Sequence, residues 1–186
     1  MNLKDRKLVL NAKQLRKGPT SLKLRGMKKI KRNEIYIVLD NVLDTYNIGS
    51  IFRLADAVAA KKIYLCGQTE IPPNHRIKKA SINTTEVVDW EYCETALKAI
   101  KKLKKQVKNI QIVSVEQAVS SIHYDKFEYI LPTVLVVGHE SDGVSPEVLK
   151  ISDAIVELPM FGINKSLNVM VSLGIVLYEV IEQIKP

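Results

Sequence analysis

The stretch LPMFGINKSLNVMVSLGIVLYE, residues 158–179, decides the fold that the sequence predicts. It begins as the end of an apolar strand, crosses a loop that holds Pro159 and Gly162, and enters a helix. Ser166 is a natural N-cap for this helix, because its hydroxyl can accept from a backbone N–H two or three residues later. From Leu167 onward, apolar residues leave almost no polar face, which predicts a helix that is buried on most sides.

Asn168 is the exception in this apolar helix, because it places an amide in the first turn. A buried amide needs hydrogen-bond partners. Two interpretations are equally compatible with the sequence: a satisfied amide that ties the loop together, or a group that binds a ligand.

Upstream of this stretch, short apolar runs alternate with helical patterns. Residues 35–39 (IYIVL) and 62–66 (KIYLC) predict strands on either side of a helix over residues 48–60. Residues 133–137 (TVLVV) form the strongest strand pattern, and residues 154–158 form the last one. This succession predicts an α/β fold with a mostly parallel sheet flanked by helices.

Weaker patterns fill the middle of the chain. Short strands are expected over residues 87–90 and 110–115, and a lysine-rich surface helix over residues 91–107. A short helix is expected to begin at Pro146, with Ser145 as its cap. The intervening residues 67–85 are long and polar, with no assigned element.

Three loops follow predicted parallel strands at their carboxyl ends: residues 40–48, 138–145 and 158–167. In open α/β sheets ligands bind beyond this edge, so three such loops predict a pocket. In or beside these loops lie polar and glycine residues suited to close contact with a ligand: Asn41, Asn47, Gly49, Gly138, Glu140, Gly143, Gly162, Ser166 and Asn168.

Several common kinds of site are not supported by the sequence. No GxxxxGK[ST] or GxGxxG pattern is present, which argues against ATPase and nicotinamide-dependent chemistry. Ser141 in GHESDG lies one position away from a nucleophile elbow, so a serine hydrolase is weakly supported. His75, His123 and His139 have no ligand spacing, and no metal site is predicted.

Composition indicates an ordinary globular protein. The chain has 186 residues, of which 46% are hydrophobic and 26% charged, enough for one domain with a real core. No long uncharged apolar run is present and the N-terminus is basic, so neither a membrane span nor a secretory signal is expected. Cys66 and Cys93 match no metal or redox spacing, which indicates reduced, structural thiols and a cytoplasmic location.

Positive charge is concentrated at the N-terminus. Residues 1–33 contain 12 Lys/Arg and one acidic residue, Asp5, a net of +11. The remaining residues contain 16 Lys/Arg and 19 Asp/Glu, a net of −3, and the two sum to the overall +8. This density predicts a basic arm over residues 1–33 that binds a polyanion, most plausibly nucleic acid, before a domain over residues 34–186.

Arg53 stands among apolar residues one turn into the helix predicted over residues 48–60. Considered alone, it fits a surface arginine. Asn47 lies six residues earlier, near the start of the helix, where an arginine suits a phosphate or another anion.

Three ordered motifs connect these observations. They are NIGSIFR at residues 47–53, VVGHESDGVS at 136–145 and LPMFGINKSLNV at 158–169. Together they resemble motifs 1, 2 and 3 of the SPOUT RNA methyltransferases, and most closely the TrmH-like branch, which methylates ribose 2′-hydroxyls of tRNA or rRNA. The resemblance covers residues 35–184.

The resemblance implies a C-terminal deep trefoil knot that forms a pocket for S-adenosylmethionine, and a homodimer that completes the active site. Such knots are rare, and no spacing argument predicts one. By motif, the cofactor would contact Ser114, Val115, Glu116, Gly138, Glu140, Leu158, Met160, Ser166 and Leu167. The polar positions implicated in catalysis, or in shaping the site, would be Asn47, Arg53, Glu140, Ser166 and Asn168.

The family account makes Arg53 the activator of the ribose hydroxyl. A guanidinium has a pKa above about 12 and is a poor base. We therefore expect Arg53 to hold the adjacent phosphate and to lower the pKa of the hydroxyl electrostatically, while proximity supplies much of the rate. The resemblance requires no metal for this chemistry.

The sequence departs from the family pattern at three places. The proline usual before the motif 1 asparagine is absent from DTYN at residues 44–47, and Ala59-Ala60 replaces an expected glycine. The separate N-terminal RNA-binding domain is also missing. The arm over residues 1–33 would take its place, assisted by the lysine-rich helix.

Two other functions stay open. The protein could be a non-catalytic RNA-binding platform with the same fold, although such a platform would not need all five polar motif positions together. It could also methylate a base rather than a ribose, which motif 3 makes the weaker interpretation. The target nucleotide is not encoded in any pattern, because RNA is recognised largely by shape and exposed bases.

Overall fold

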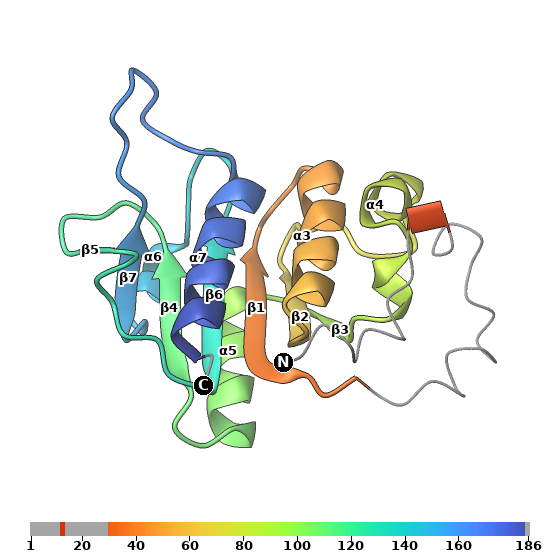
Figure 1. Cartoon of the computed structure of the whole chain (residues 1–186), viewed down its shortest axis with the longest axis horizontal. Helices are drawn as coiled ribbons and strands as arrows, with labels where there is room; N and C mark the ends of the chain where they lie inside the picture. The colour runs from red at the N-terminus through yellow and green to blue at the C-terminus, as the bar shows by residue number, and fades with distance from the viewer. Residues whose placement is uncertain (1–11, 14–29, 185–186) are drawn as a thin grey trace.

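The computed structural model describes residues 12–13 and 30–184. Most of the predicted basic arm, residues 1–33, lies outside these ranges. The described chain forms one layered α/β structure (Figure 1), as the sequence predicted.

Seven strands form a single sheet in the order β3-β2-β1-β6-β4-β7-β5, and every paired strand is parallel. The strands are β1 (Asn33–Asp40), β2 (Ala60–Cys66), β3 (Trp90–Cys93), β4 (Gln111–Val115), β5 (Ile122–His123), β6 (Thr133–Gly138) and β7 (Ala154–Glu157). Because all strands run the same way, their carboxyl ends meet at one edge of the sheet.

Helices cover both faces of the sheet, with α3 and α7 in front and α5 behind in the view of Figure 1. They are α3 (Thr45–Ala57), α4 (His75–Ser81), α5 (Ala96–Gln106), α6 (Pro146–Leu149) and α7 (Val169–Ile184), with a 3-10 turn, η2 (Thr84–Glu86). The core is therefore double: α3, α4 and α7 pack on one face, and α5 and α6 pack on the other.

Strand β1 is buried on both faces of the sheet, which explains the uninterrupted apolar run over residues 35–39. Successive side chains of a strand point to opposite faces. Ile35, Ile37 and Leu39 enter the core with α3 and α7, whereas Tyr36 and Val38 enter the core with α5. A central parallel strand that is buried on both faces must therefore be apolar at every position.

Several element boundaries differ from the sequence prediction. Helix α3 begins at Thr45, because the Asp44 carboxylate caps it by accepting from the backbone N–H groups of Tyr46 and Asn47. Asn47 is thus part of the helix rather than of the preceding loop. The lysine-rich helix α5 begins only at Ala96, because β3 extends to Cys93. Helix α4, η2 and β5 had no clear sequence pattern.

Within the described chain, helix α7 is buried on fewer sides than the sequence predicted. Only one side of it is buried, by Leu173, Val176, Leu177 and Val180. The opposite side carries apolar residues that are partly open to solvent: Val171 (37% exposed), Ile175 (36%) and Tyr178 (55%). The helix has almost no polar face, as expected, but within the described chain nothing covers this second side.

The cap of α7 also differs from the prediction. Asn168, not Ser166, caps the helix: its side-chain oxygen accepts from the N–H groups of Met170 and Val171, at 2.9 and 3.4 Å. Both Ser166 and Asn168 are exposed residues in the loop before the helix. The trefoil threading of this loop stays a prediction of the family resemblance.

Cys66 and Cys93 are both free thiols, as predicted. They are distant in the sequence, yet they are register partners at the ends of β2 and β3. Burial raises the pKa of both thiols, Cys66 more strongly because it is fully buried. Low thiolate content makes both groups poor nucleophiles.

No helix within residues 12–13 and 30–184 is long and apolar enough to cross a membrane. Over the same residues, no three His, Cys, Asp or Glu side chains lie close enough together to hold a metal ion.

Candidate active site

A pocket of about 380 Å³ opens at the carboxyl ends of β4, β6 and β7, beside the start of α7. Its walls come from the loops after these strands, including the loop over residues 158–168. Most of the predicted cofactor positions line it: Val115, Glu116, Gly138, Glu140, Leu158, Met160, Ser166 and Leu167. Segments far apart in the sequence thus meet at one place, as the parallel topology predicted.

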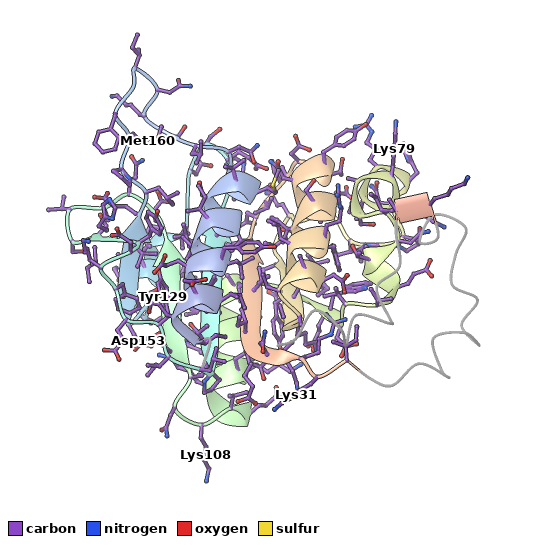
Figure 2. The ribbon with its side chains drawn as sticks, viewed as in Figure 1. Lys31, Lys79, Lys108, Tyr129, Asp153 and Met160 are labelled. Carbon is purple, nitrogen blue, oxygen red and sulfur yellow. The ribbon has the colours of Figure 1, made fainter. Side chains whose placement is uncertain are left out.

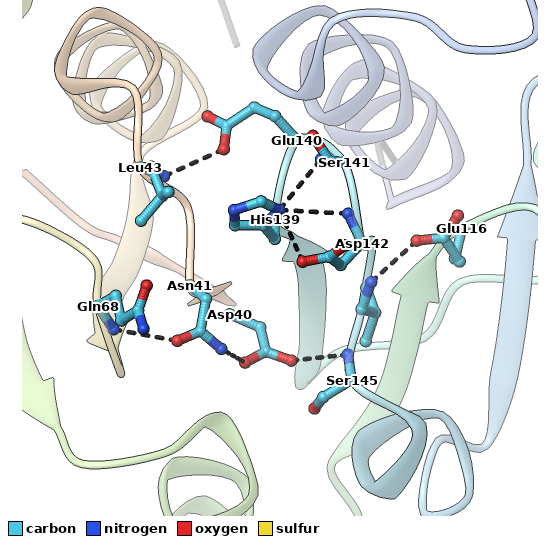
Figure 3. A network of polar contacts seen from close by, with 11 residues as sticks. Asp40, Asn41, Leu43, Gln68, Glu116, His139, Glu140, Ser141, Asp142 and Ser145 are labelled. Atoms are coloured by element: carbon cyan, nitrogen blue, oxygen red, sulfur yellow. Dashed lines mark hydrogen bonds and ion pairs between the residues drawn. The ribbon is translucent and has the colours of Figure 1, made fainter.

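Glu140 holds the loop after β6 against the loop after β1. Its carboxylate accepts from the backbone N–H groups of Leu43 and Asp44 and from the side-chain amide of Asn47, each at 3.1 Å. Figure 3 shows the contact with Leu43. Both carboxylate oxygens are therefore used in binding the chain itself. Glu140 joins motif 2 to the first turn of α3.

Asn47 continues this chain of contacts to α7. Its amide N–H donates to Glu140, while its side-chain oxygen accepts from the Asn168 amide at 3.1 Å. Asn168 in turn caps α7 through its own side-chain oxygen. The three motifs are thus joined by one relay, Glu140–Asn47–Asn168, which we call the motif relay. Asn47 is 7% exposed, and its partners satisfy both ends of its amide.

The motif relay has an electrostatic consequence for Glu140. Partial desolvation raises the pKa of the Glu140 carboxyl, but the hydrogen bonds from Leu43, Asp44 and Asn47 lower it by more. The net pKa lies below the ordinary value of 4.5. At neutral pH Glu140 is a charged, fully engaged acceptor, which suits positioning better than proton abstraction.

The loop over residues 138–145 is also fixed from both sides. The buried Asp40 carboxylate, at the end of β1, accepts from the backbone N–H of Ser145 at 2.9 Å (Figure 3). On the other side, Glu116 at the end of β4 accepts from Val144 N–H at 2.9 Å. Asp40 was missed from the sequence, although an acid directly after a buried strand is a signal that could have found it.

Two glycines make this loop possible. A Cβ on Gly138 would lie 2.1 Å from the carbonyl carbon of Gly143, so the backbone passes too closely for any side chain. Gly143 has a φ of +71°, and a Cβ there would lie 2.1 Å from a Glu116 carboxylate oxygen. The glycines of motif 2 are therefore required by contact as well as by conformation.

His139 lines the pocket and stabilises the turn that follows it. Its Nδ1 accepts from the backbone N–H groups of Ser141 and Asp142, at 3.1 and 3.2 Å (Figure 3). The same nitrogen lies 3.4 Å from a carboxylate oxygen of Asp142. From the sequence, His139 was considered only as a metal ligand, and no role was predicted for it.

Three predicted site residues do not line the pocket. The Ser114 side chain is fully buried and shares a hydrogen bond with the Ser152 hydroxyl at 2.8 Å, so it faces the core. Asn47 lies behind the pocket wall, within the motif relay. Arg53 is exposed on α3 and makes no ion pair or hydrogen bond among the described residues.

Arg53 and Asn47 lie on different sides of α3. Six residues of an α-helix correspond to a rotation that leaves two side chains about 120° apart around the axis. Asn47 faces α7 and is buried, whereas Arg53 faces solvent. Arg53 is also absent from the residues that line the pocket of its own chain.

The pocket also contains residues that the sequence analysis did not select. They flank the predicted positions on the same strands and loops: Gln117, Val137, His139, Ser141, Val156, Glu157, Val169 and Ser172. Gln117 has a specific contact, because its side-chain amide donates to the Lys165 carbonyl at 2.8 Å and so holds the loop over residues 158–168. No periodic pattern in the sequence marks this residue.

The geometry matches a known family. The family model described as "SpoU rRNA Methylase family" matches residues 34–178. The chain belongs to the SpoU rRNA methylase family. A tRNA (guanosine(18)-2′-O)-methyltransferase of Aquifex aeolicus is 34% identical to this SpoU family chain over 161 residues, which are 84% of the chain and 73% of the relative.

Solved structures of the SpoU methylase family share this fold. The A. aeolicus TrmH/SpoU tRNA modifying enzyme has a TM-score of 0.74 at 30% identity, over 92% of this chain and 81% of that one. An rRNA methyltransferase of Sinorhizobium meliloti with bound AdoMet (S-adenosylmethionine) has a TM-score of 0.75 at 27% identity, over 88% and 61%. In several other curated relatives, this chain spans 59–63% of the full length.

Membership of the SpoU methylase family confirms four predictions from the sequence: the family, the α/β fold, a methyltransferase activity and S-adenosylmethionine as cofactor. The catalytic interpretation is favoured over the non-catalytic platform. The roles of single residues, the homodimer and the basic arm stay predictions.

Proposed function

We propose that this chain transfers a methyl group from S-adenosylmethionine to a ribose 2′-hydroxyl of tRNA or rRNA, in the cytoplasm. The observation that carries the proposal is that motifs 2 and 3 line one pocket at the carboxyl edge of the sheet, with motif 1 joined to both through Asn47. Relatives of this family are named for ribose methylation of tRNA or of 23S rRNA.

The pocket fits the cofactor in size and in chemistry. Its volume of about 380 Å³ lies within the range of small-molecule sites. Val137, Val156, Leu158 and Leu167 supply apolar walls for an adenine ring, while Gly138 brings backbone close to the ligand. S-adenosylmethionine supplies an electrophilic methyl group on a positively charged sulfur.

The residues of the chain then have to bring a ribose oxygen in line with that methyl group. The oxygen forms a bond to the methyl carbon as the carbon–sulfur bond breaks, and the hydroxyl proton leaves to solvent or a nearby base. Glu140 is a poor candidate for that base, because both its oxygens accept hydrogen bonds and its pKa is lowered. The motif relay serves instead to hold the pocket walls at fixed positions.

Arg53 is proposed to act in the pocket of a second copy. It does not line the pocket of its own chain, and it has no polar partner among the described residues. The exposed apolar side of α7 gives a second copy a surface to pack against, through Val171, Ile175 and Tyr178. In such a homodimer, Arg53 of one copy would hold the phosphate beside the ribose bound by the other.

The first experiment separates an enzyme from an RNA-binding platform. Calorimetry with S-adenosylmethionine should show binding to the full chain, and unmodified tRNA or rRNA should receive a radiolabelled methyl group. Arg53→Ala should lose methyl transfer by at least about 100-fold while cofactor affinity stays unchanged. Absence of cofactor binding by the wild-type chain would support the platform, and undiminished turnover by Arg53→Ala would remove this residue from the mechanism.

A mixing experiment tests whether the site is shared. Arg53→Ala keeps a complete pocket, whereas Ser166→Trp fills the pocket from an exposed position that lines it and keeps Arg53. Each variant alone should be inactive. Mixed dimers should regain activity, because one of their two sites combines an open pocket with an intact arginine. Failure of the mixture, with dimers present, argues that each chain uses its own Arg53.

Residues 1–33 are proposed to bind RNA as a basic arm attached to the catalytic domain over residues 34–186. Contacts between lysines and phosphates release counterions, so RNA affinity should fall steeply with salt. Deleting residues 1–33 should weaken RNA binding and flatten this salt dependence while cofactor binding persists. Unchanged RNA affinity would assign RNA binding to the domain alone. A ribose-methylation map of cellular RNA with and without the protein would identify the target nucleotide.

A further inference from the structure

We infer that the outer face of α3 and α4 is a binding surface for the RNA segment that flanks the target nucleotide. The surface consists of Arg53 on α3 and of His75, Arg76, Lys78 and Lys79 on α4, and we call it the α3–α4 basic surface. All five residues are exposed, and within the described chain none of their side chains makes an ion pair or hydrogen bond. This inference rests on RNA being the substrate, as proposed above.

The packing of α4 on α3 makes these cations one continuous surface. Gly49 of α3 touches α4, since a Cβ there would lie 2.6 Å from the Ala80 Cβ. Arg53 follows Gly49 by four residues, so it lies one turn further along the same side of α3. Ile77 is fully buried under α4, which leaves its basic residues on the outside. Figure 2 shows Lys79 directed away from the body of the protein.

The lysines of α5 are a weaker candidate for this role. Helix α5 packs on the opposite face of the sheet from α3 and α4. Lys98 and Lys102 form ion pairs with Glu94 and Glu91, and the Lys104 ammonium donates to the Ile151 carbonyl at 3.3 Å. Three of its lysines thus already have partners, and none shares a face with Arg53.

A hollow beside α4 suggests that the surface also binds a base of the RNA. A second cavity of about 390 Å³ lies beside the start of α4, with His75 and Lys78 on its wall. The half-buried indole of Trp90, the carboxylate of Glu86 and the ring of Pro73 also line it. Bases stack readily on aromatic and proline rings, and a carboxylate can accept from the amino group of a base.

The distribution of charge in this hollow selects one part of the RNA. Glu86 on the wall of the hollow repels phosphate, whereas Lys78 on the same wall and Arg76 beside it on α4 attract phosphate. A nucleotide would therefore place its base inside, against Trp90, and leave its backbone on the α4 cations. The surface fits unpaired RNA, because a base held inside a duplex could not enter.

Trp90 gives a direct reporter for this arrangement, because the chain contains a single tryptophan. The full chain should be titrated with an unmodified tRNA transcript while tryptophan emission is followed. Stacking of a base should quench the emission in parallel with binding. If RNA saturates the protein by filter binding and the emission does not change, the hollow is not the base site.

A pair of charge-reversal variants tests the surface itself. Arg76→Glu/Lys79→Glu should raise the Kd for the transcript at least about 10-fold and reduce the slope of log Kd against log salt by about 0.7 for each phosphate that is no longer neutralised. Lys101→Glu/Lys105→Glu makes the same change at exposed α5 positions and should alter the Kd less than about 2-fold. Equal effects of the two variants would overturn the inference.

Two controls separate this inference from the proposed function. Thermal unfolding must show that both double variants are folded, and calorimetry should show unchanged affinity for S-adenosylmethionine. A wild-type chain that binds no cofactor contradicts the proposed function, whatever the RNA result. A chain that binds cofactor and methylates RNA equally well in the α4 and α5 variants contradicts only the α3–α4 basic surface.

Discussion

Single side chains that hydrogen-bond to two other segments at once hold the site together. Asn47 donates to Glu140 with one end of its amide and accepts from Asn168 with the other. From the sequence, both asparagines and Glu140 were identified as important through the family motifs. Their actual partners could not be predicted, because hydrogen bonds between residues 93 and 121 positions apart leave no local pattern.

Glu140→Gln should lower thermal stability, because an NH₂ donor would replace one oxygen that accepts from backbone N–H groups. The pKa of Glu140 is lowered in the folded protein, so its charge stabilises the fold fully above about pH 4.5 and less as the pH falls through the folded-state pKa. The difference in Tm between wild type and variant should therefore be constant near neutral pH and shrink in acid.

Circular dichroism melts between about pH 3 and pH 7 can measure this dependence. Glu147→Gln is the matched control, since Glu147 is exposed on α6 and its side chain has no hydrogen bond in the described structure. The control should show almost no change in Tm at any pH. A Glu140→Gln effect that persists undiminished in acid would mean that the charge of Glu140 is irrelevant.

The contribution of His139 to the turn can be tested with a side chain that replaces only its Nδ1 acceptor. An asparagine at this position would offer a side-chain oxygen to the same two N–H groups, as asparagine does in Asx turns. His139→Ala should therefore cost about 1 kcal/mol of unfolding free energy, and His139→Asn should cost clearly less. Urea unfolding of both variants measures the difference, and equal losses would assign the effect to the ring rather than to Nδ1.

At the scale of elements, the positions of the main strands could be predicted from the sequence. What packs against each side of a helix could not. Buried parallel strands are apolar at every position, so runs such as IYIVL and TVLVV located β1 and β6 closely. Helix α7 was located correctly, but its composition could not tell whether the chain itself or a second copy covers its far side. The short α4 and η2 are held by caps and packing rather than by periodicity.

The contact between α3 and α4 depends on Gly49. Alanine is favoured over glycine in a helix by about 1 kcal/mol. At this position, however, a Cβ would lie 2.6 Å from the Ala80 Cβ and 2.7 Å from the Ile77 carbonyl oxygen. Overpacking of this kind costs about 1–3 kcal/mol, so Gly49→Ala should be destabilising despite the gain in propensity.

Gly162→Ala provides the comparison for Gly49→Ala in urea unfolding. A Cβ at Gly162 would meet nothing within 4 Å, so its effect should stay within about 0.5 kcal/mol. A stabilised Gly49→Ala protein would show that α4 can move away from α3 without loss.

At the scale of the whole molecule, the position of the pocket could be predicted from the sequence. Which motif residues line it in one chain could not. Parallel strands bring their carboxyl ends together, so the three loops had to converge. Arg53 and Ser114 were assigned by motif, yet neither faces the pocket of its own chain. Ser114 illustrates the alternation of strands, since its neighbour Val115 lines the pocket while Ser114 points to the opposite core.

The exposed side of α7 predicts the oligomeric state. Ile175→Asp should convert a dimer to a monomer in sedimentation velocity, because burying an unpaired carboxylate in an apolar interface is costly. The variant should keep cofactor binding, since the pocket lies within one chain, and lose methyl transfer. Ile71→Asp is the control, because Ile71 is similarly exposed (40%) but lies between β2 and α4. Dissociation by both variants, or by neither, contradicts this interface.

The motif relay also sets an order in time. Its three members leave the ribosome in the sequence Asn47, Glu140, Asn168, and the last member caps the last helix. A nascent chain that ends after β7 has two walls of the pocket and no third. We therefore expect a nascent chain that does not yet include Asn168 to be inactive on RNA.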